Sequence, residues 1–125
     1  MKTFGKIIIF ICIIFVLNAY KLSAQEKIKI GLLVPLTGKD AEIGQSIIKA
    51  TRLAINKIND DKIEILPKDT ESNALKTFSA AKELREVGAK IVIGPIFNKN
   101  LNYLDKFEDM IFLSLTNKNI NNPKN

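Results

Sequence analysis

The apolar positions of this chain follow two alternating periods once the first 25 residues are passed. Four short stretches are almost continuously apolar, which is typical of strands covered on both faces of a sheet. They comprise residues 28–36, 62–66, 90–94 and 110–115. Pro67 closes the second stretch, because proline has no main-chain N–H to donate. The pattern therefore predicts four strands separated by polar junctions.

Between the first two strands, apolar side chains recur at the spacing of an amphipathic helix. Residues 42–59 place five of them along one side of the predicted helix, flanked by Ile48 and Ile55. These five are Ile43, Ile47, Ala50, Ala54 and Ile58. The opposite side is polar, so the five-residue side is expected to face the core.

Two further helices are predicted between the remaining strands. One spans residues 74–87, where Asn73 is a good N-cap and Gly88 fits the position after the last turn. Its core side is expected to carry Phe78, Ala81, Leu84 and Val87. The other spans residues 99–108 and carries Leu101, Leu104 and Phe107.

Regular alternation of strand and helix predicts an α/β fold, a parallel sheet with helices on both faces and right-handed crossovers. Ligands of such sheets bind beyond the carboxyl ends of the strands. Four loops share that edge here: residues 36–38, 68–70, 95–98 and 116–117. Thr37 and Gly38 also precede a helix N-terminus, where free N–H groups favour an anion such as a carboxylate.

The first 24 residues have the pattern of a cleavable export signal. Lys2 and Lys6 precede an unbroken apolar run over residues 7–17. That run is shorter than the roughly 20 residues that span a bilayer as a helix. Cleavage is expected after Ala24, leaving Gln25 first, and an uncleaved anchor is the alternative. The protein is therefore predicted to be exported.

Charge and composition exclude several kinds of chemistry. The formal charge of +6 falls to +3 once the three lysines of the predicted signal are subtracted, and no basic stripe with interleaved aromatics is present. Nucleic acid is therefore not an expected partner. The chain has no His, and its one Cys, at position 12, lies within the predicted signal. This removes His-based acid–base chemistry, thiol nucleophiles and nearly all zinc or copper ligand sets.

The remaining candidates for catalysis are two carboxylate pairs, at residues 60–61 and 108–109. Both lie at polar junctions and are interpreted as solvated turns. Nucleotide binding is also disfavoured, because no G-x-G-x-x-G occurs and Gly38-Lys39 lacks the rest of a P-loop. The sequence predicts neither an enzyme nor a cofactor or metal site.

The stretch "IKIGLLVPLTGKDAEIGQSIIKATRLAINKIN" (residues 28–59) resembles the opening of type 1 periplasmic binding proteins of the leucine/isoleucine/valine-binding class. The matching positions are Pro35, Leu36, Thr37, Gly38, Gly44, Ala54, Ile58 and Asn59. "GAKIVIGPIF" (residues 88–97) matches a later segment of that family, with Gly94 and Pro95 as its turn. The resemblance covers nearly all of the chain after the predicted signal.

This resemblance implies a periplasmic solute-binding domain of an ABC-type amino-acid uptake system, which works with a membrane permease. Family members have two lobes that close on the ligand, so residues 25–125 are expected to form only part of the first lobe of a truncated protein. The expected ligand-binding residues are Thr37, Gly38, Asp69, Phe97, Asn98, Thr116 and Asn117. For some of these residues a structural role is the alternative. Thr37 and Asp40 are suited to capping the first helix, Asp69 to ending a strand and capping a turn, and Phe97 to packing on the lobe.

A second branch of the same fold remains open. Amino-acid-binding relatives place Ser residues after the Gly-Pro turn, whereas this chain has Phe97-Asn98-Lys99-Asn100. "IEILPKDT" (residues 63–70) and "GPIF" (residues 94–97) resemble the penicillin-binding protein activator group, which contacts peptidoglycan synthases. On that alternative, Phe97 is an aromatic anchor for the synthase.

Overall fold

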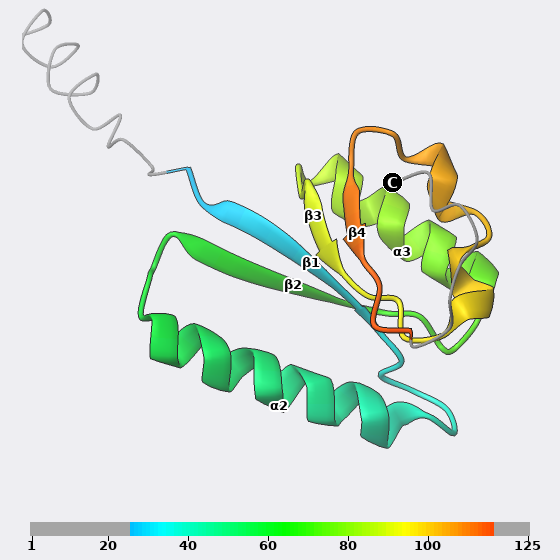
Figure 1. Ribbon diagram of the computed structural model, residues 1–125, viewed down its shortest axis with the longest axis horizontal. Coiled ribbons are helices and arrows are strands. Elements are labelled where there is room, and N and C mark those ends of the chain that lie inside the picture. Colours follow the sequence, from blue (N-terminus) through cyan, green and yellow to red (C-terminus); the bar gives the residue numbers. More distant parts are fainter. Residues whose placement is uncertain (1–25, 117–125) are drawn as a thin grey trace, which may run out of the picture.

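The computed structural model describes residues 26–116, and its elements alternate as the sequence predicts (Figure 1). The four strands are β1 (Ile28–Val34), β2 (Ile63–Asp69), β3 (Ile91–Ile93) and β4 (Ile111–Leu113). The helices are α2 (Ala41–Ile58) and α3 (Ala74–Glu86), and the short 3-10 helices are η1 (Asn98–Leu101) and η2 (Leu104–Lys106). The predicted export signal, with Ala24 and Gln25, and the predicted site residue Asn117 lie outside the described residues.

The four strands form one sheet in the order β2-β1-β3-β4, and every neighbouring pair is parallel. Helix α2 lies on one face of the sheet, and α3 with η1 and η2 lies on the other (Figure 1). The α/β class and the parallel sheet with helices on both faces are thus confirmed.

The face covered by α3 holds most of the core. Alternate strand residues, Leu33 of β1 and Val92 of β3, are fully buried there. Ala81 and Leu84 of α3 pack on them, and small side chains let the helix approach closely. The rest of this cluster is Ala80, Ala89, Leu104, Phe107 and Met110. Asn73 caps α3 as predicted, since its side chain accepts hydrogen bonds from the N–H groups of Leu75 and Lys76.

The face covered by α2 is much thinner. Its buried cluster consists of Leu32, Val34 and Ile48. The predicted core side of α2 is wrong, because Ile43 is 45% exposed and Ile58 is 58% exposed. The helix instead turns Gly44 and Ile48 toward the sheet. Isoleucine and alanine lie on two adjoining sides of this helix, so periodicity alone could not tell which side packs on the sheet.

Three smaller predictions also fail for local reasons. Residues 99–108 form two 3-10 turns in place of one helix, although Leu104 and Phe107 are still buried. Val87 follows the last residue of α3 and is 46% exposed. Strand β2 continues through Pro67 to Asp69, which is possible because β2 is an edge strand and needs no N–H on its outer side.

Candidate functional site

The carboxyl ends of the four strands meet at one edge of the sheet, which we call the rim. From β1 the chain crosses to β2 on one side, and from β2 it crosses back over β1 to β3. Adjacent strands whose connections leave in opposite directions open a crevice between their ends, where ligands of α/β sheets bind. The loops after β1 and β3 flank this crevice.

Asp69 holds the β1 loop in place at the rim. Its Oδ1 accepts hydrogen bonds from the N–H groups of Leu36 and Glu71, each at 2.8 Å. Its Oδ2 accepts a hydrogen bond from the Thr37 hydroxyl at 2.6 Å. Asp69 is also the last residue of β2, so one carboxylate ends a strand, caps the following turn and ties two predicted site residues together.

These hydrogen bonds favour the ionised form of Asp69. Partial burial at the rim acts to raise the pKa, but the hydrogen bond from Thr37 and those from the N–H groups of Leu36 and Glu71 together outweigh it. The pKa of Asp69 therefore lies below its ordinary value of 3.8. Asp69 forms no ion pair among residues 26–116, so it presents a negative charge balanced only by hydrogen-bond donors.

The same contacts change what Thr37 offers a ligand. Its one hydroxyl proton is donated to Asp69, which leaves the oxygen with acceptor capacity only. The side chain of Asp40, at the N-cap position of α2, makes no cap hydrogen bond and accepts a hydrogen bond from the Ser72 hydroxyl at 2.7 Å. This side of the rim is therefore acidic and rich in acceptors.

The turn into α2 depends on two glycines. Gly38 has a φ of +79°, a conformation that L side chains rarely adopt, and its carbonyl accepts the N–H of Ala41. At Gly44, an added Cβ would lie 1.7 Å from the carbonyl oxygen of Pro35. The first turn of α2 thus packs directly on the main chain of the β1 loop.

The loops after β3 and β4 are joined to each other. Gly94 and Pro95 are linked by a cis peptide bond, and Gly94 packs against the main chain of Leu33. The Pro95 carbonyl accepts the N–H of Leu115 at 3.0 Å and the hydroxyl of Ser114 at 3.3 Å. The Thr116 N–H donates to the Ser114 hydroxyl oxygen at 3.3 Å. This network fixes Thr116 next to the Gly-Pro turn.

Phe97 and Asn98 follow that turn and are both half-buried. The ammonium group of Lys99 lies 5.8 Å from the centroid of the Phe97 ring, so this side of the rim carries a cation and an amide. Asn100 is fully buried, and its side-chain amide has no hydrogen-bond partner in the part of the chain that the structure describes. Sequence reasoning missed Asn100, because an Asn in a polar run gives no sign of burial.

The predicted site residues therefore form two groups on opposite sides of the crevice. Thr37, Gly38 and Asp69 lie on the β1–β2 side, while Phe97, Asn98 and Thr116 lie on the β3–β4 side. Sequence reasoning also missed the hydrogen bond between Asp40 and Ser72, because it joins residues 32 positions apart. Over residues 26–116 no cluster of His, Cys, Asp and Glu could hold a metal ion. No helix within that range is both long and apolar enough to cross a membrane.

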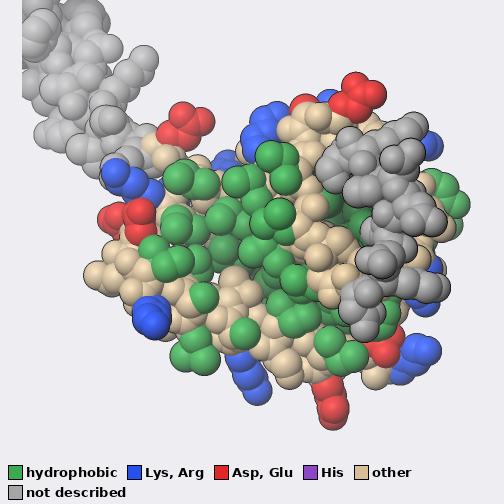
Figure 2. All heavy atoms as spheres, in the orientation of Figure 1, with side chains coloured by type: hydrophobic (Ala, Val, Ile, Leu, Met, Phe, Trp, Pro, Cys, Tyr) green, Lys and Arg blue, Asp and Glu red, His purple; other side chains and the backbone are tan. Residues whose placement is uncertain are grey.

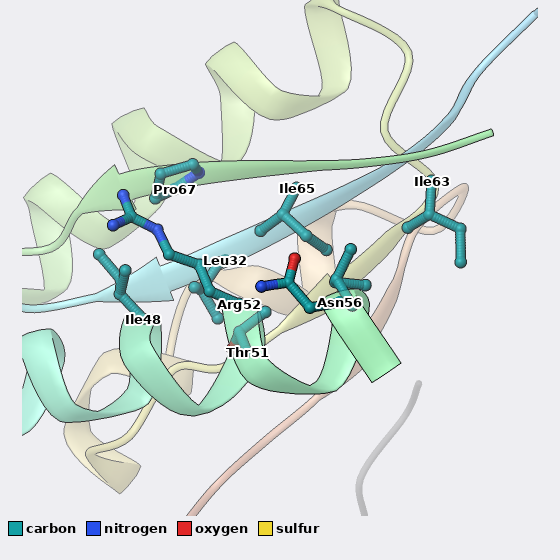
Figure 3. A pocket seen from close by; sticks show the side chains of 9 residues that line it. Leu32, Ile48, Thr51, Arg52, Asn56, Ile63, Ile65 and Pro67 are labelled. Carbon is teal, nitrogen blue, oxygen red and sulfur yellow. The ribbon is translucent and has the colours of Figure 1, made fainter. Parts of the chain in front are cut away.

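A separate hollow lies between α2 and β2 (Figure 3). It has a volume of about 230 Å³, and Arg52 and Asn56 project from α2 toward Pro67 and Ile65 of β2. Aliphatic side chains form its floor, and it lies away from the rim. We interpret it as incomplete packing of α2 on the sheet.

Comparison with known proteins identifies the family. A family model described as "Periplasmic binding protein" matches residues 27–117, and the chain belongs to this family. The expected resemblance to type 1 periplasmic binding proteins is thus confirmed. No curated protein matches the chain significantly.

Solved structures share the fold. The solute binding protein of an ABC transporter from Rhodopseudomonas palustris, in complex with 3,4-dihydroxybenzoic acid, is 31% identical over 60% of this chain, with a TM-score of 0.57. The branched-chain amino acid transporter substrate binding protein LivJ from Streptococcus pneumoniae, in complex with isoleucine, is 22% identical over 74% of this chain, with a TM-score of 0.61.

The C-domain of LpoA from Haemophilus influenzae, a regulator of PBP1A, is 24% identical over 69% of this chain, with a TM-score of 0.58. The matched part makes up 22% of the Rhodopseudomonas chain, 30% of LivJ and 27% of the LpoA domain. The chain thus spans less than a third of the length of these structures, which fits one part of a larger fold.

Proposed function

We propose that this chain is part of the first lobe of an exported, periplasmic solute-binding protein, and that it serves an ABC-type amino-acid uptake system with a membrane permease. The observation that carries the proposal is the reversal of crossover direction between β1 and β3, whose following loops carry the Thr37–Asp69 pair and Phe97-Asn98. The family of the chain and the isoleucine bound by LivJ support the same class of ligand.

The charges at the rim favour one orientation of the amino acid. The Asp69 carboxylate and the Thr37 oxygen accept hydrogen bonds, so the ligand's ammonium group is assigned to the β1–β2 side. The Asn98 amide and the Lys99 ammonium group supply donors on the β3–β4 side, so the ligand's carboxylate is assigned there. From the sequence, Thr37 and Gly38 were expected to favour the carboxylate. The hydroxyl proton that Thr37 gives to Asp69 is the reason for reversing the orientation.

Titration followed by NMR tests the proposal on the processed chain. Isoleucine at millimolar concentration should shift the amide signals of Thr37, Gly38 and Asn98. An acid without an ammonium group, 3,4-dihydroxybenzoate, should bind about tenfold or more weakly, because it leaves Asp69 without a charged donor.

Asp69→Asn is the informative variant, with Asp61→Asn as its matched control in an exposed turn. Asp69→Asn should weaken isoleucine binding about tenfold, and the control should leave it unchanged. The absence of rim shifts with any amino acid would contradict a role in amino-acid uptake. Tighter binding of dihydroxybenzoate than of isoleucine would replace the amino acid by an aromatic acid as the ligand.

A second candidate function rests on Phe97. Phe97 is half-buried beside Lys99, and the fold is shared with LpoA, a regulator of PBP1A. On this alternative, Phe97 anchors a peptidoglycan synthase, and truncation of such an anchor costs about 2 kcal/mol or more of binding energy.

A pull-down from envelope extracts separates the two functions. A peptidoglycan synthase should be captured by the unmodified chain and largely lost with Phe97→Ala. Tyr103→Ala is the matched control, because Tyr103 is an aromatic residue that is 41% exposed and packs on Phe78, away from the Gly94–Pro95 turn. Equal capture by all three forms would leave Phe97 with a packing role.

A further inference from the structure

The hollow between α2 and β2 has an apolar interior. Its floor is Leu32 of β1, which is 1% exposed, and its two walls are α2 and β2. Most of the residues that line it are apolar: Leu32, Ile48, Ile55, Ile63, Ile65 and Pro67. Figure 2 shows hydrophobic side chains gathered over the strands beside α2. Water in contact with such a surface is readily replaced by hydrocarbon, because burial of apolar area is favourable.

Two polar side chains of α2 stand over this apolar interior. Arg52 and Asn56 are four residues apart, so they lie on the same side of the helix, and both project toward β2 (Figure 3). No Asp or Glu lines the hollow. Over residues 26–116, Arg52 forms no ion pair. Its guanidinium group therefore stands beside hydrocarbon without an acidic partner in the described part of the chain.

The hollow lies at the β2 edge of the sheet, where Pro67 limits what can pair with the strand. The carbonyl of Lys62 and the N–H of Thr70 both bond to β1. Main-chain groups of successive strand residues point to alternate sides, so the nitrogen of Pro67 lies on the outer side. Proline cannot donate to a neighbouring strand, and a further strand is therefore not expected beside β2.

The boundary of the hollow is local to one part of the chain. All of its lining residues lie between residues 32 and 67, and β4 is at the opposite edge of the sheet. The volume is about 230 Å³. At about 30 Å³ for each non-hydrogen atom, the share of one water in the liquid, there is room for about eight such atoms. The hollow thus suits a small molecule and is too small for a polypeptide segment.

We propose that this hollow is a second ligand site, and that its ligand is a small aliphatic carboxylate. The carboxylate pairs with the guanidinium group of Arg52, which has the planar donor geometry for two parallel hydrogen bonds. The amide of Asn56 supplies a further donor on the same side of α2. The hydrocarbon chain of the ligand lies against Ile48, Ile55 and Ile65.

The charge of the hollow separates this site from the rim. A free amino acid carries an ammonium group, and the hollow offers that group only hydrocarbon and the cation of Arg52. The rim offers the carboxylate of Asp69. The two sites should therefore select different ligands, and the second site does not depend on the proposed uptake of amino acids.

Methyl NMR of the isotope-labelled chain, titrated with hexanoate, tests the proposal. Hexanoate has eight non-hydrogen atoms and one negative charge. At millimolar concentration it should shift the methyl signals of Ile48, Ile55 and Ile65 in a saturable way, and leave the amide signals of Thr37 and Asn98 at the rim unchanged. Hexanamide has the same shape without the charge, and should bind about tenfold or more weakly.

Arg52→Gln should weaken hexanoate binding about tenfold and leave hexanamide binding unchanged. Glutamine is a good helix former and Arg52 is exposed, so the fold should be retained, which circular dichroism checks. Lys57→Gln is the matched control, because Lys57 is an exposed cation of α2 that does not line the hollow. It should leave hexanoate binding unchanged.

Three results would overturn the proposal. Methyl signals of the three isoleucines that stay fixed at every concentration would show that the hollow takes no such ligand. Equal affinity for hexanoate and hexanamide would show that the carboxylate is not recognised. Hexanoate binding that withstands Arg52→Gln would assign the ligand to another group.

Discussion

The two faces of the sheet are packed very differently, although each is crossed by one long helix. On the α3 side, nine buried residues, among them Leu84, form one cluster. On the α2 side, three buried residues lie beneath a helix that leaves β3 and β4 uncovered. The difference shows that α3 packs closely on its face of the sheet, whereas α2 contacts its face through few buried side chains.

Helix α2 is held at its N-terminal end more than along its length. Gly44 packs on the Pro35 carbonyl, Asp40 accepts a hydrogen bond from Ser72, and Thr37 donates to Asp69. All three contacts lie at the rim. The proposed solute site and the anchoring of α2 therefore share the same loops.

Truncation of one buried residue on each face should give the largest loss of stability. It also measures the difference in packing between the two faces directly. Leu84→Ala should lower the free energy of unfolding by about 3–5 kcal/mol, because Leu84 is fully buried in close packing. Ile48→Ala should cost only about 2 kcal/mol, since Ile48 borders the hollow beneath α2. Urea denaturation at a fixed protein concentration provides both values. Equal costs would mean that the two faces are equally well packed.

Gly44→Ala tests the main anchor of α2. The new Cβ would meet the Pro35 oxygen at 1.7 Å, so the helix must shift, at a cost of about 1–3 kcal/mol. In an unobstructed helix the same change stabilises by up to about 1 kcal/mol. Ser46→Ala, two residues along on the exposed side, is the control and should change stability by less than about 0.5 kcal/mol. A stabilised Gly44→Ala variant would refute the close contact.

Asp69→Asn should have the next largest effect, and its size should depend on pH. At pH 7 the loss of the charged acceptor for three donors should cost about 1–2 kcal/mol. The folded pKa of Asp69 is lowered, so its contribution is complete above the ordinary value of 3.8 and is lost as the pH falls through the folded value. The unmodified chain should therefore approach the variant in stability at pH 2–3. A difference that stays constant from pH 7 to pH 2 would contradict this role.

The smallest effect concerns the exposed ion pairs that Asp109 forms with Arg85 and Lys90. Asp109 accepts hydrogen bonds from Lys90 and Arg85, which lower its pKa. Lys90→Gln should raise that pKa toward its ordinary value, as followed by NMR of the carboxyl carbon. Lys82→Gln is the control, because Lys82 of α3 pairs with Glu86 instead. This variant should leave the pKa of Asp109 unchanged. Identical titration of Asp109 in all three forms would rule out the pairing.

Much of the fold could be predicted from the sequence because local rules and packing agree. Asn73 and Gly88 set the ends of α3, and alternating apolar strands with amphipathic helices lead to a parallel sheet. The prediction failed where the local pattern and the packing disagree. Helix α2 has two adjoining apolar sides, and periodicity assumes that the more regular one is buried. The structure buries the side with Gly44, because only there can the helix approach the Pro35 carbonyl.

The candidate site was predictable in position but not in chemistry. The rule that ligands bind beyond strand ends selected the four loops, and the structure places the described ones at a single edge. The direction of the Thr37 hydroxyl proton could not be read from the sequence, because it depends on Asp69, 32 residues away. That one contact is the basis of the ligand orientation proposed above.

Hydrogen exchange of main-chain amides tests most directly whether the two faces of the sheet differ in packing. At about 1 µM, amides of β1, β3 and α3 should exchange slowly, while those in the C-terminal half of α2 should exchange much faster. Amides of α2 that exchange as slowly as those of α3 would contradict the difference between the two faces.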